Sequence, residues 1–170
     1  MVHSIELLFD PDTEATIRGV WEALDDAPDV VSQTPAGRPH VTLVVAERIG
    51  AAADAALRPL TGRLPLRCTV GAPVLLGRSH AILARLIVPS ADLLALHVAA
   101  HGLSGPHLES APAPNTLPDQ WTPHVTLARR VAGPTLSAAA GVAGTPPAFE
   151  GTFAALRRWD GDAKVDYLIG

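Results

Sequence analysis

The chain has 170 residues, of which 48% are hydrophobic and 18% charged, and its formal net charge at neutral pH is −4. This composition excludes a disordered chain, and it lacks the strongly basic balance of proteins that bind extended duplex nucleic acid. The single cysteine, Cys68, excludes an internal disulfide and a cysteine-rich zinc site. There is no basic leader and no apolar run near the roughly 18 residues of a membrane span, so we expect a cytoplasmic protein without membrane contact.

The first half of the chain predicts strands and helices in alternation. Asp10 and Pro11 are suited to the cap and first turn of a helix, and Gly71 and Pro73 would interrupt a later strand. In chain order we predict a strand at 2–9, a helix at 10–27, a strand at 38–49, a short helix at 50–60 and one or two strands at 64–76.

The second half predicts the same alternation. Ser90 is a candidate helix cap, and Gly102 lies near the end of that helix. In chain order we predict a strand at 79–88, a helix at 89–103, a strand at 121–131, a short helix at 135–144, and a hairpin of strands at 149–160 and 163–170. The Pro-rich segment at 104–120 is predicted as a mobile loop that partly closes over a functional groove.

One five-residue string, Pro-His-Val-Thr-Leu, occurs in both halves, at residues 39–43 and 123–127. In each half it opens the second strand. The repeat therefore indicates two similar lobes related by an approximate two-fold axis. We predict a single bilobed domain over residues 1–170, with lobe one at about 1–75, lobe two at about 76–170, and interleaving of strands possible.

The repeated string places a histidine and a threonine on one face of each strand. Side chains at positions i and i+2 of a strand point the same way, so His40 lies beside Thr42 and His124 beside Thr126. One imidazole can accept a proton while the other donates one, and the hydroxyls can hold the oxygens of an anion. This set is suited to in-line displacement at a phosphodiester without a metal ion.

The paired "HVTL" strings resemble the two-histidine (2H) phosphoesterase superfamily, and "TPHVTLARR" is most similar to its branch of 2′-5′ RNA ligases and RNA 2′,3′-cyclic phosphodiesterases. The resemblance implies an α+β fold with duplicated β-α-β-α-β lobes, whose antiparallel sheets line a central groove. It also implies RNA-processing chemistry with no metal or cofactor. His40 and His124 would be the catalytic acid–base pair, and Thr42 and Thr126 would bind substrate.

A basic residue often follows the second motif in this family, and the chain offers Arg129 and Arg130. The family position favours Arg129, whereas strict alternation from His124 favours Arg130, and a β-bulge would reconcile the two. We keep both as candidate substrate-binding residues.

The resulting prediction is hydrolysis of a 2′,3′-cyclic phosphate on an RNA end or nucleotide. The alternatives are 2′-5′ RNA ligation and non-catalytic binding of a nucleotide or RNA. We expect a monomer whose partner is a small nucleotide or RNA end.

The remaining polar clusters receive structural interpretations. His97 and His101 have the i, i+4 spacing of a metal pair, but a surface helix face is favoured. We expect structural roles for His3 and His80, although either could approach the groove. The Arg-Arg-Trp cluster at residues 157–159 could stack a base, but an ordinary strand end is favoured. Cys68 is predicted as a small buried residue.

Overall fold

The computed structural model describes residues 1–77 and 81–170, and its helices and strands form an α+β fold, as predicted. The first residues of the strand expected at 79–88, and His80 with them, lie outside the described residues. The strands are β1 (His3–Phe9), β2 (His40–Ala46), β3 (Leu66–Leu76), β4 (Ala81–Ile87), β5 (His124–Val131), β6 (Phe149–Asp160) and β7 (Val165–Ile169). The α-helices are α1 (Pro11–Asp26), α2 (Ala52–Leu57), α3 (Ala91–Ser104) and α4 (Leu136–Ala143).

The helix starts follow the capping signals in the sequence. The Asp10 carboxylate accepts the backbone N–H of Thr13 at 2.9 Å, and Pro11 occupies the first turn of α1. The Ser90 hydroxyl accepts the N–H of Leu93 at 3.2 Å and starts α3 in the same way. Short 3₁₀ helices extend the connections at Arg58–Arg63, Gly105–His107, Pro114–Thr116 and Gly133–Thr135.

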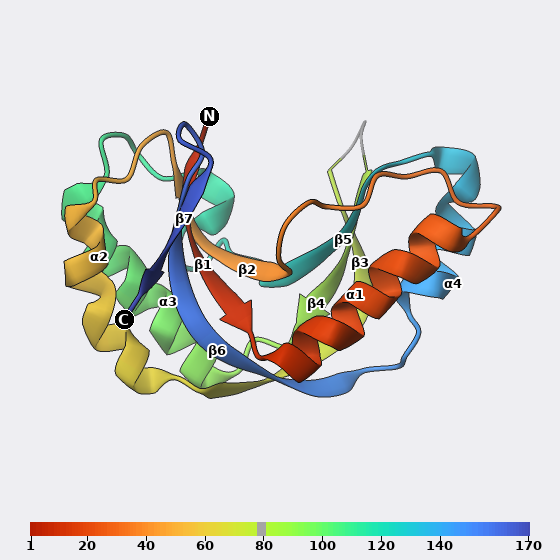
Figure 1. Cartoon of the computed structure of the whole chain (residues 1–170), viewed down its shortest axis with the longest axis horizontal. Coiled ribbons are helices and arrows are strands. Elements are labelled where there is room, and N and C mark those ends of the chain that lie inside the picture. The colour runs from red at the N-terminus through yellow and green to blue at the C-terminus, as the bar shows by residue number, and fades with distance from the viewer. Residues whose placement is uncertain (78–80) are drawn as a thin grey trace.

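All strand pairs are antiparallel, in the order β1-β2-β5-β4-β3-β6-β7, with a further pairing between β1 and β6 (Figure 1). The seven strands are hydrogen-bonded into one set, which we describe as two sheets, with β1, β2 and β7 in one and β3, β4 and β5 in the other. The long strand β6 belongs to both. Its first residues, from Phe149 to Phe153, pair with β3, and its later residues, from Phe153 to Trp159, pair with β1. Opposite this junction, β2 and β5 meet through one residue pair, Val41 with Val125. The two sheets are therefore joined firmly along β6 and narrowly where the two motif strands meet.

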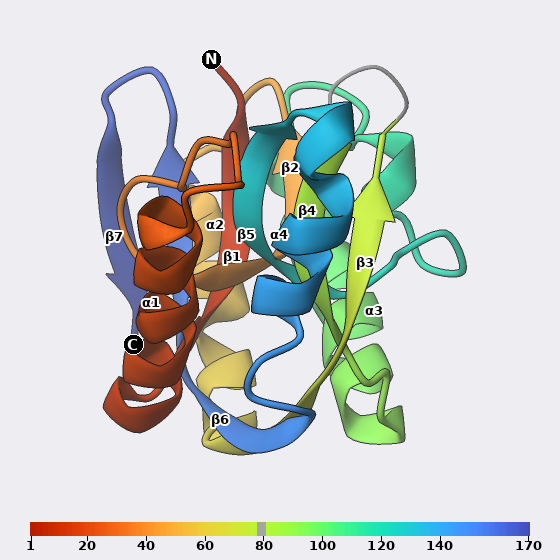
Figure 2. The ribbon, with the colours of Figure 1, turned by 90° about the vertical axis from the view of Figure 1, so that its right-hand side faces the viewer.

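The helices cover the outer faces of the two sheets and interleave along the chain. In Figure 1, α2 and α3 lie on the side of β1, β2 and β7, whereas α1 and α4 lie on the side of β3, β4 and β5. Figure 2 shows α1 and α4 side by side on that second face. Each of the two long helices packs against a strand on the other side of the molecule from the strand that precedes it. Helix α1 follows β1 and packs against β5, and α3 follows β4 and packs against β2. The predicted lobe boundary near residue 75 falls within β3.

Strand β3 is one continuous strand that carries a bulge, which settles the choice between one strand and two. Its register against β4 shifts between Val70 and Pro73. The buried guanidinium of Arg85, 2% exposed, donates to the carbonyl oxygen of Gly71 in this bulge, and to those of Ala143 and Pro146 at 2.8 and 2.9 Å. Gly71 and Pro73 therefore bend the strand without ending it.

The core is built from aliphatic side chains on the inner faces of the helices and strands, including Leu7, Ile17, Leu43, Val70 and Leu127. Cys68 is also buried, as expected, and burial raises the pKa of its thiol to about 12. Within residues 1–77 and 81–170, no helix combines the length and apolar character needed to cross a membrane.

The Pro-rich segment 104–120 is hydrogen-bonded to the end of β2 and to the residues that follow it. The N–H of Ala113 donates to the Val45 carbonyl at 2.8 Å, and the N–H of Glu109 donates to the Arg48 carbonyl at 3.2 Å. The N–H of Gly50 donates to the His107 carbonyl at 2.9 Å. These bonds place the segment beside the end of β2, and none of its residues lines the cavity described below.

Candidate active site

A cavity of about 510 Å³ opens over the junction of the two sheets, on the face that carries the first motif. Strands β1, β2, β5 and β6 all contribute to its wall. The lining residues are Val2, Ser4, Glu6, Ala36, Gly37, His40, Thr42, Val45, Arg129, Arg157 and Trp159. His124 and Thr126 lie at the junction on the adjoining strand, because their neighbour Val125 pairs with Val41.

Each motif strand presents its polar face away from the core. Val41 and Leu43 are fully buried, and so are Val125 and Leu127 to within 1%, whereas the histidines and threonines are half-buried. In an antiparallel register centred on the Val41–Val125 pair, position 40 faces position 126 and position 42 faces position 124. The two imidazoles and two hydroxyls are thus brought to one small region.

Both imidazoles are oriented by the same local hydrogen bond. Nδ1 of His40 lies 2.8 Å from the carbonyl oxygen of Arg38, and Nδ1 of His124 lies 2.7 Å from that of Thr122. A carbonyl oxygen can only accept a hydrogen bond, so Nδ1 of each ring carries a proton and donates it. Nε2 of each ring is left to accept or release a proton, which is the requirement for general acid–base chemistry.

The proton affinity of His124 is lowered by its surroundings. Burial lowers the pKa of His124 below the usual histidine value, and the nearby charge of His40 acts in the same direction. The hydrogen bond to the Thr122 carbonyl opposes part of this effect. The neutral form of His124 is consequently favoured, which is the form that accepts a proton.

Two tryptophans donate hydrogen bonds to the backbones of the motif strands, and sequence reasoning did not identify them. The indole N–H of Trp121 donates to the Thr42 carbonyl at 2.9 Å, and that of Trp21 donates to the Thr126 carbonyl at 3.1 Å. Each motif threonine therefore has its backbone held by an indole while its side chain points away from the core. A Trp at helical spacing on α1, and another just before the second motif, were the available signals.

The prediction of a surface face for His97 and His101 is wrong for His97, which is 1% exposed. Its ring stacks on Trp121 with centroids 3.8 Å apart. Nε2 of each histidine lies within 3.1 Å of the Leu43 carbonyl, and Nε2 of His97 also approaches the Thr116 carbonyl. The pair supplies hydrogen bonds to the backbone of the first motif at Leu43, and burial lowers the pKa of His97.

The cluster at residues 157–159 is likewise not an ordinary strand end. Arg157 and Arg158 are buried, at 7% and 4% exposed, and alternation along β6 sends them to opposite faces. Arg158 forms two hydrogen bonds with the Asp54 carboxylate at 2.7 and 2.9 Å, whereas Arg157 and Trp159 line the cavity. The charged groups lie inside because each arginine meets a carboxylate from another element.

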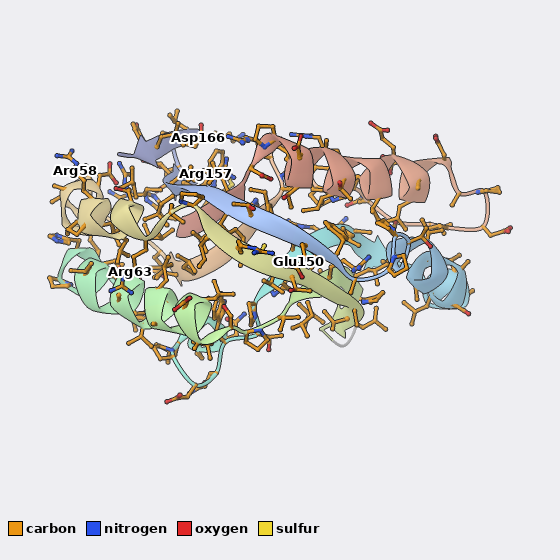
Figure 3. All side chains as sticks on the ribbon, turned by 90° about the horizontal axis from the view of Figure 1, so that it is seen from below. Arg58, Arg63, Glu150, Arg157 and Asp166 are labelled. Atoms are coloured by element: carbon orange, nitrogen blue, oxygen red, sulfur yellow. The ribbon has the colours of Figure 1, made fainter. Side chains whose placement is uncertain are left out.

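A buried charge network lies beside His40. The Glu6 carboxylate, 4% exposed, accepts hydrogen bonds from Nε of Arg157 at 2.7 Å and from the Ser4 hydroxyl at 2.6 Å. Arg157 also binds the Asp166 carboxylate at 3.1 Å, and Figure 3 labels these two residues on adjoining strands. Oε1 of Glu6 lies 3.5 Å from Nε2 of His40. A lone acidic residue in the apolar strand "HSIELLF" was the sequence signal for this network.

A bulge determines which of the two candidate arginines reaches the cavity. The register of β5 against β4 shifts by one residue between Thr126 and Ala128, and again between Ala128 and Val131. Arg129 then lines the cavity, with its backbone N–H and carbonyl both paired with Gln33 at 2.8 Å. Arg130 takes a left-handed backbone conformation, with φ of 52°, and is not among the lining residues.

His3 belongs to a separate cluster on the other face of β1. Its Nε2 lies 3.3 Å from carboxylate oxygens of both Asp160 and Asp162, the one grouping in the described parts of the chain whose donor atoms could surround a metal ion. The Ile49 N–H, however, donates to Nδ1 at 3.3 Å, so Nε2 of neutral His3 carries the proton and has no free lone pair. The cluster is therefore suited to hydrogen bonding between His3 and the carboxylates.

Two sheets that meet at paired His-x-Thr strands define a two-histidine phosphoesterase fold, and comparison with known proteins agrees. Residues 9–163 match the family described as the 2′-5′ RNA ligase superfamily. The chain belongs to this family.

Solved structures with the same fold are distant in sequence. LigT of Escherichia coli in its apo form superposes with a TM-score of 0.62 at 18% identity, covering 99% of this chain and 94% of that chain. TT0787 of Thermus thermophilus gives 0.58 at 15% identity, covering 100% and 96%. Usb1 of Kluyveromyces marxianus with uridine monophosphate gives 0.57 at 11% identity, covering 99% and 97%. No curated protein matches the chain by sequence.

Proposed function

We propose that the protein hydrolyses 2′,3′-cyclic phosphates on nucleotides or RNA ends by paired histidine acid–base catalysis. The observation that carries the proposal is the equivalent setting of His40 and His124. Both rings donate from Nδ1 to a backbone carbonyl and leave Nε2 available, on strands that meet at one residue pair. Membership in the superfamily supports phosphoesterase-type chemistry, and the cyclic phosphate is the finer part of the proposal.

The two histidines take opposite parts in the reaction. Neutral His124 accepts a proton at Nε2 from water, and the water oxygen forms the new bond to phosphorus. The bond between phosphorus and one ribose oxygen breaks, and His40 gives its Nε2 proton to that leaving oxygen. One water is consumed and a phosphomonoester is formed. The lowered pKa of His124 supports its role as the base.

Hydroxyl and guanidinium donors would hold the phosphate oxygens between these rings. Thr42 and Thr126 share the faces of the two histidines, and Arg129 supplies a positive charge at the cavity wall. Related structures include LigT complexed with 3′-AMP and with phosphate, and Usb1 with uridine monophosphate, which supports a ligand of nucleotide size. The net charge of −4 also favours a mononucleotide or an RNA end over a long RNA.

The test is a turnover assay on a 2′,3′-cyclic mononucleotide and on an oligonucleotide with a cyclic-phosphate end, in excess chelator. We expect the cyclic phosphate to open to a phosphomonoester, which ³¹P NMR detects. The double variant His40→Ala, His124→Ala is the inactive control. Addition of an RNA with a free 5′-hydroxyl end tests the alternative, 2′-5′ ligation. Binding of the mononucleotide without any turnover would favour a non-catalytic role. Turnover that chelator abolishes and one divalent ion restores would contradict the two-histidine mechanism.

A further inference from the structure

We propose that Glu6 is a positioning residue that keeps a proton on Nε2 of His40 in the free enzyme, and thereby makes His40 the proton donor. The inference rests on the proposed function for its catalytic meaning. Its physical content, which is the protonation of His40 beside a buried carboxylate, can be measured without turnover.

Hydrogen-bond acceptors lie beside both ring nitrogens of His40, so the surroundings suit a ring that carries a proton on each nitrogen. Nδ1 already donates to the Arg38 carbonyl at 2.8 Å. Nε2 faces Oε1 of Glu6 at 3.5 Å, and a carboxylate oxygen repels a lone pair but attracts an N–H. The two acceptors on opposite sides of the ring are therefore complementary to the imidazolium. His124 has the carbonyl partner at Nδ1, but the described residues provide no carboxylate at its Nε2.

Both carboxylate oxygens of Glu6 have hydrogen-bond donors of their own. The side chain is 5% exposed, and a buried carboxylate without a partner would take up a proton. Arg157 donates to its Oε2 at 2.7 Å, and the Ser4 hydroxyl donates to its Oε1 at 2.6 Å. Arg157 is shared with Asp166 at 3.1 Å, so two carboxylates and one guanidinium leave one negative charge unbalanced. A protonated His40 neutralises that charge.

The charges that face His40 act in both directions. Glu6 on β1 favours the protonated ring, and Asp166 on β7 weakens the effect of Arg157. Arg157 on β6, with Nη2 at 3.5 Å from Nδ1 of His40, opposes protonation. On β5, Arg129 lines the same cavity and His124 interacts with His40 through charge, and both also oppose it. Glu6 is the carboxylate in contact with the ring, so its removal should have the largest effect in this set.

The experiment compares Glu6→Gln with Asp166→Asn, since each removes one negative charge from a partner of Arg157 and only Glu6 touches His40. The protonation of His40 is followed by NMR of ¹⁵N-histidine-labelled protein without substrate. In Glu6→Gln we expect the Nε2 proton to be lost at a pH about one unit lower than in the wild type, because a contacting opposite charge typically shifts titration by about 1–3 units. In Asp166→Asn the shift should be less than about half of that.

A second variant and a kinetic profile complete the test. Glu6→Asp keeps the charge on a shorter side chain, so its His40 titration should lie closer to that of the wild type than the titration in Glu6→Gln does. It also serves as the second variant if Glu6→Gln folds poorly. The descending limb of kcat/KM against pH should move with the His40 titration. An unchanged His40 titration in Glu6→Gln, or equal shifts in Glu6→Gln and Asp166→Asn, would overturn the proposal. Absence of turnover in the wild type would instead refute the proposed function, while the NMR titration would still decide where the proton is held.

Discussion

Strands β2 and β5 carry the same Pro-His-Val-Thr-Leu string in different surroundings. Backbone interactions are alike on the two strands, because each histidine binds the carbonyl two residues before it and each threonine carbonyl accepts a tryptophan N–H. Side-chain neighbours differ, because His40 faces the carboxylate of Glu6 whereas His124 faces no such group in the described residues. The comparison indicates that the repeat sets the geometry of the site, and that the neighbouring strands set the chemical role of each half.

The largest expected effect is the loss of either imidazole. His40→Ala and His124→Ala should each lower kcat by about 10²–10⁴-fold, the usual contribution of a positioned acid or base. The double variant should lose less than the product of the two single losses, because the residues act as a unit. Steady-state kinetics on a cyclic mononucleotide provides the measurement.

His107→Ala is a matched control, because His107 lies outside the cavity lining. Circular dichroism should show the wild-type fold for all of these proteins. Near-wild-type turnover in a well-folded His40→Ala or His124→Ala protein would contradict the paired-histidine mechanism, because one copy of the motif would then be dispensable.

The next effect tests whether the two threonines are equivalent. Thr42→Val and Thr126→Val each remove one hydroxyl donor to an anion, and a hydrogen bond to a charged group contributes about 1.5–3 kcal/mol. We therefore expect each variant to lower kcat/KM by roughly 10–100-fold, and to a similar extent. A loss confined to one of the two strands would show that the phosphate is held by a single lobe.

The two arginines after the second motif should differ from one another. Arg129→Ala should lower kcat/KM by about threefold to tenfold, because Arg129 is an exposed cation at the cavity wall. Arg130→Ala should leave kcat/KM nearly unchanged, since Arg130 is not a lining residue. A larger loss in Arg130→Ala than in Arg129→Ala would contradict the position that the β5 bulge gives to Arg129.

The smallest expected effect concerns the acidic limb of the pH profile. His124 must be neutral to accept a proton, and its pKa is lowered from the usual value of 6.5 by burial and by the charge of His40. The ascending limb of kcat/KM should therefore lie below pH 6.5. In His40→Ala, NMR should show His124 losing its proton at a higher pH than in the wild type, because one cause of the lowering is gone. A shift in the opposite direction would show that the two rings do not interact through charge.

The motif strands could be predicted because their information is local. Alternation over five residues places His40 with Thr42, and a repeated string implies a repeated setting. The bulge before Arg129 could be named as one possibility, but its presence depends on the pairing of β5 with β4. The pairing of β1 with β6 aligns Glu6 with Arg157, 151 positions apart, and no local pattern encodes that register.

The burial of His97 and Arg157 shows where sequence reasoning by residue type fails. Arginine is mostly exposed and histidine is intermediate in burial, and helical or strand periodicity alone does not reveal a partner from another element. His97 is buried because Trp121 stacks on it and a backbone carbonyl needs a donor. Arg157 is buried because two carboxylates converge on it.

The exchange of helices between the two sheets has a consequence for synthesis on the ribosome. The apolar side of α1, with Ile17, Val20 and Leu24, is buried beside β5 and α4, which emerge about a hundred residues later. Strand β6 emerges after β5 and α4 and pairs with both β1 and β3. The nascent chain therefore cannot complete either lobe until β6 is released, so both lobes should acquire their fold in one cooperative step once β6 is available.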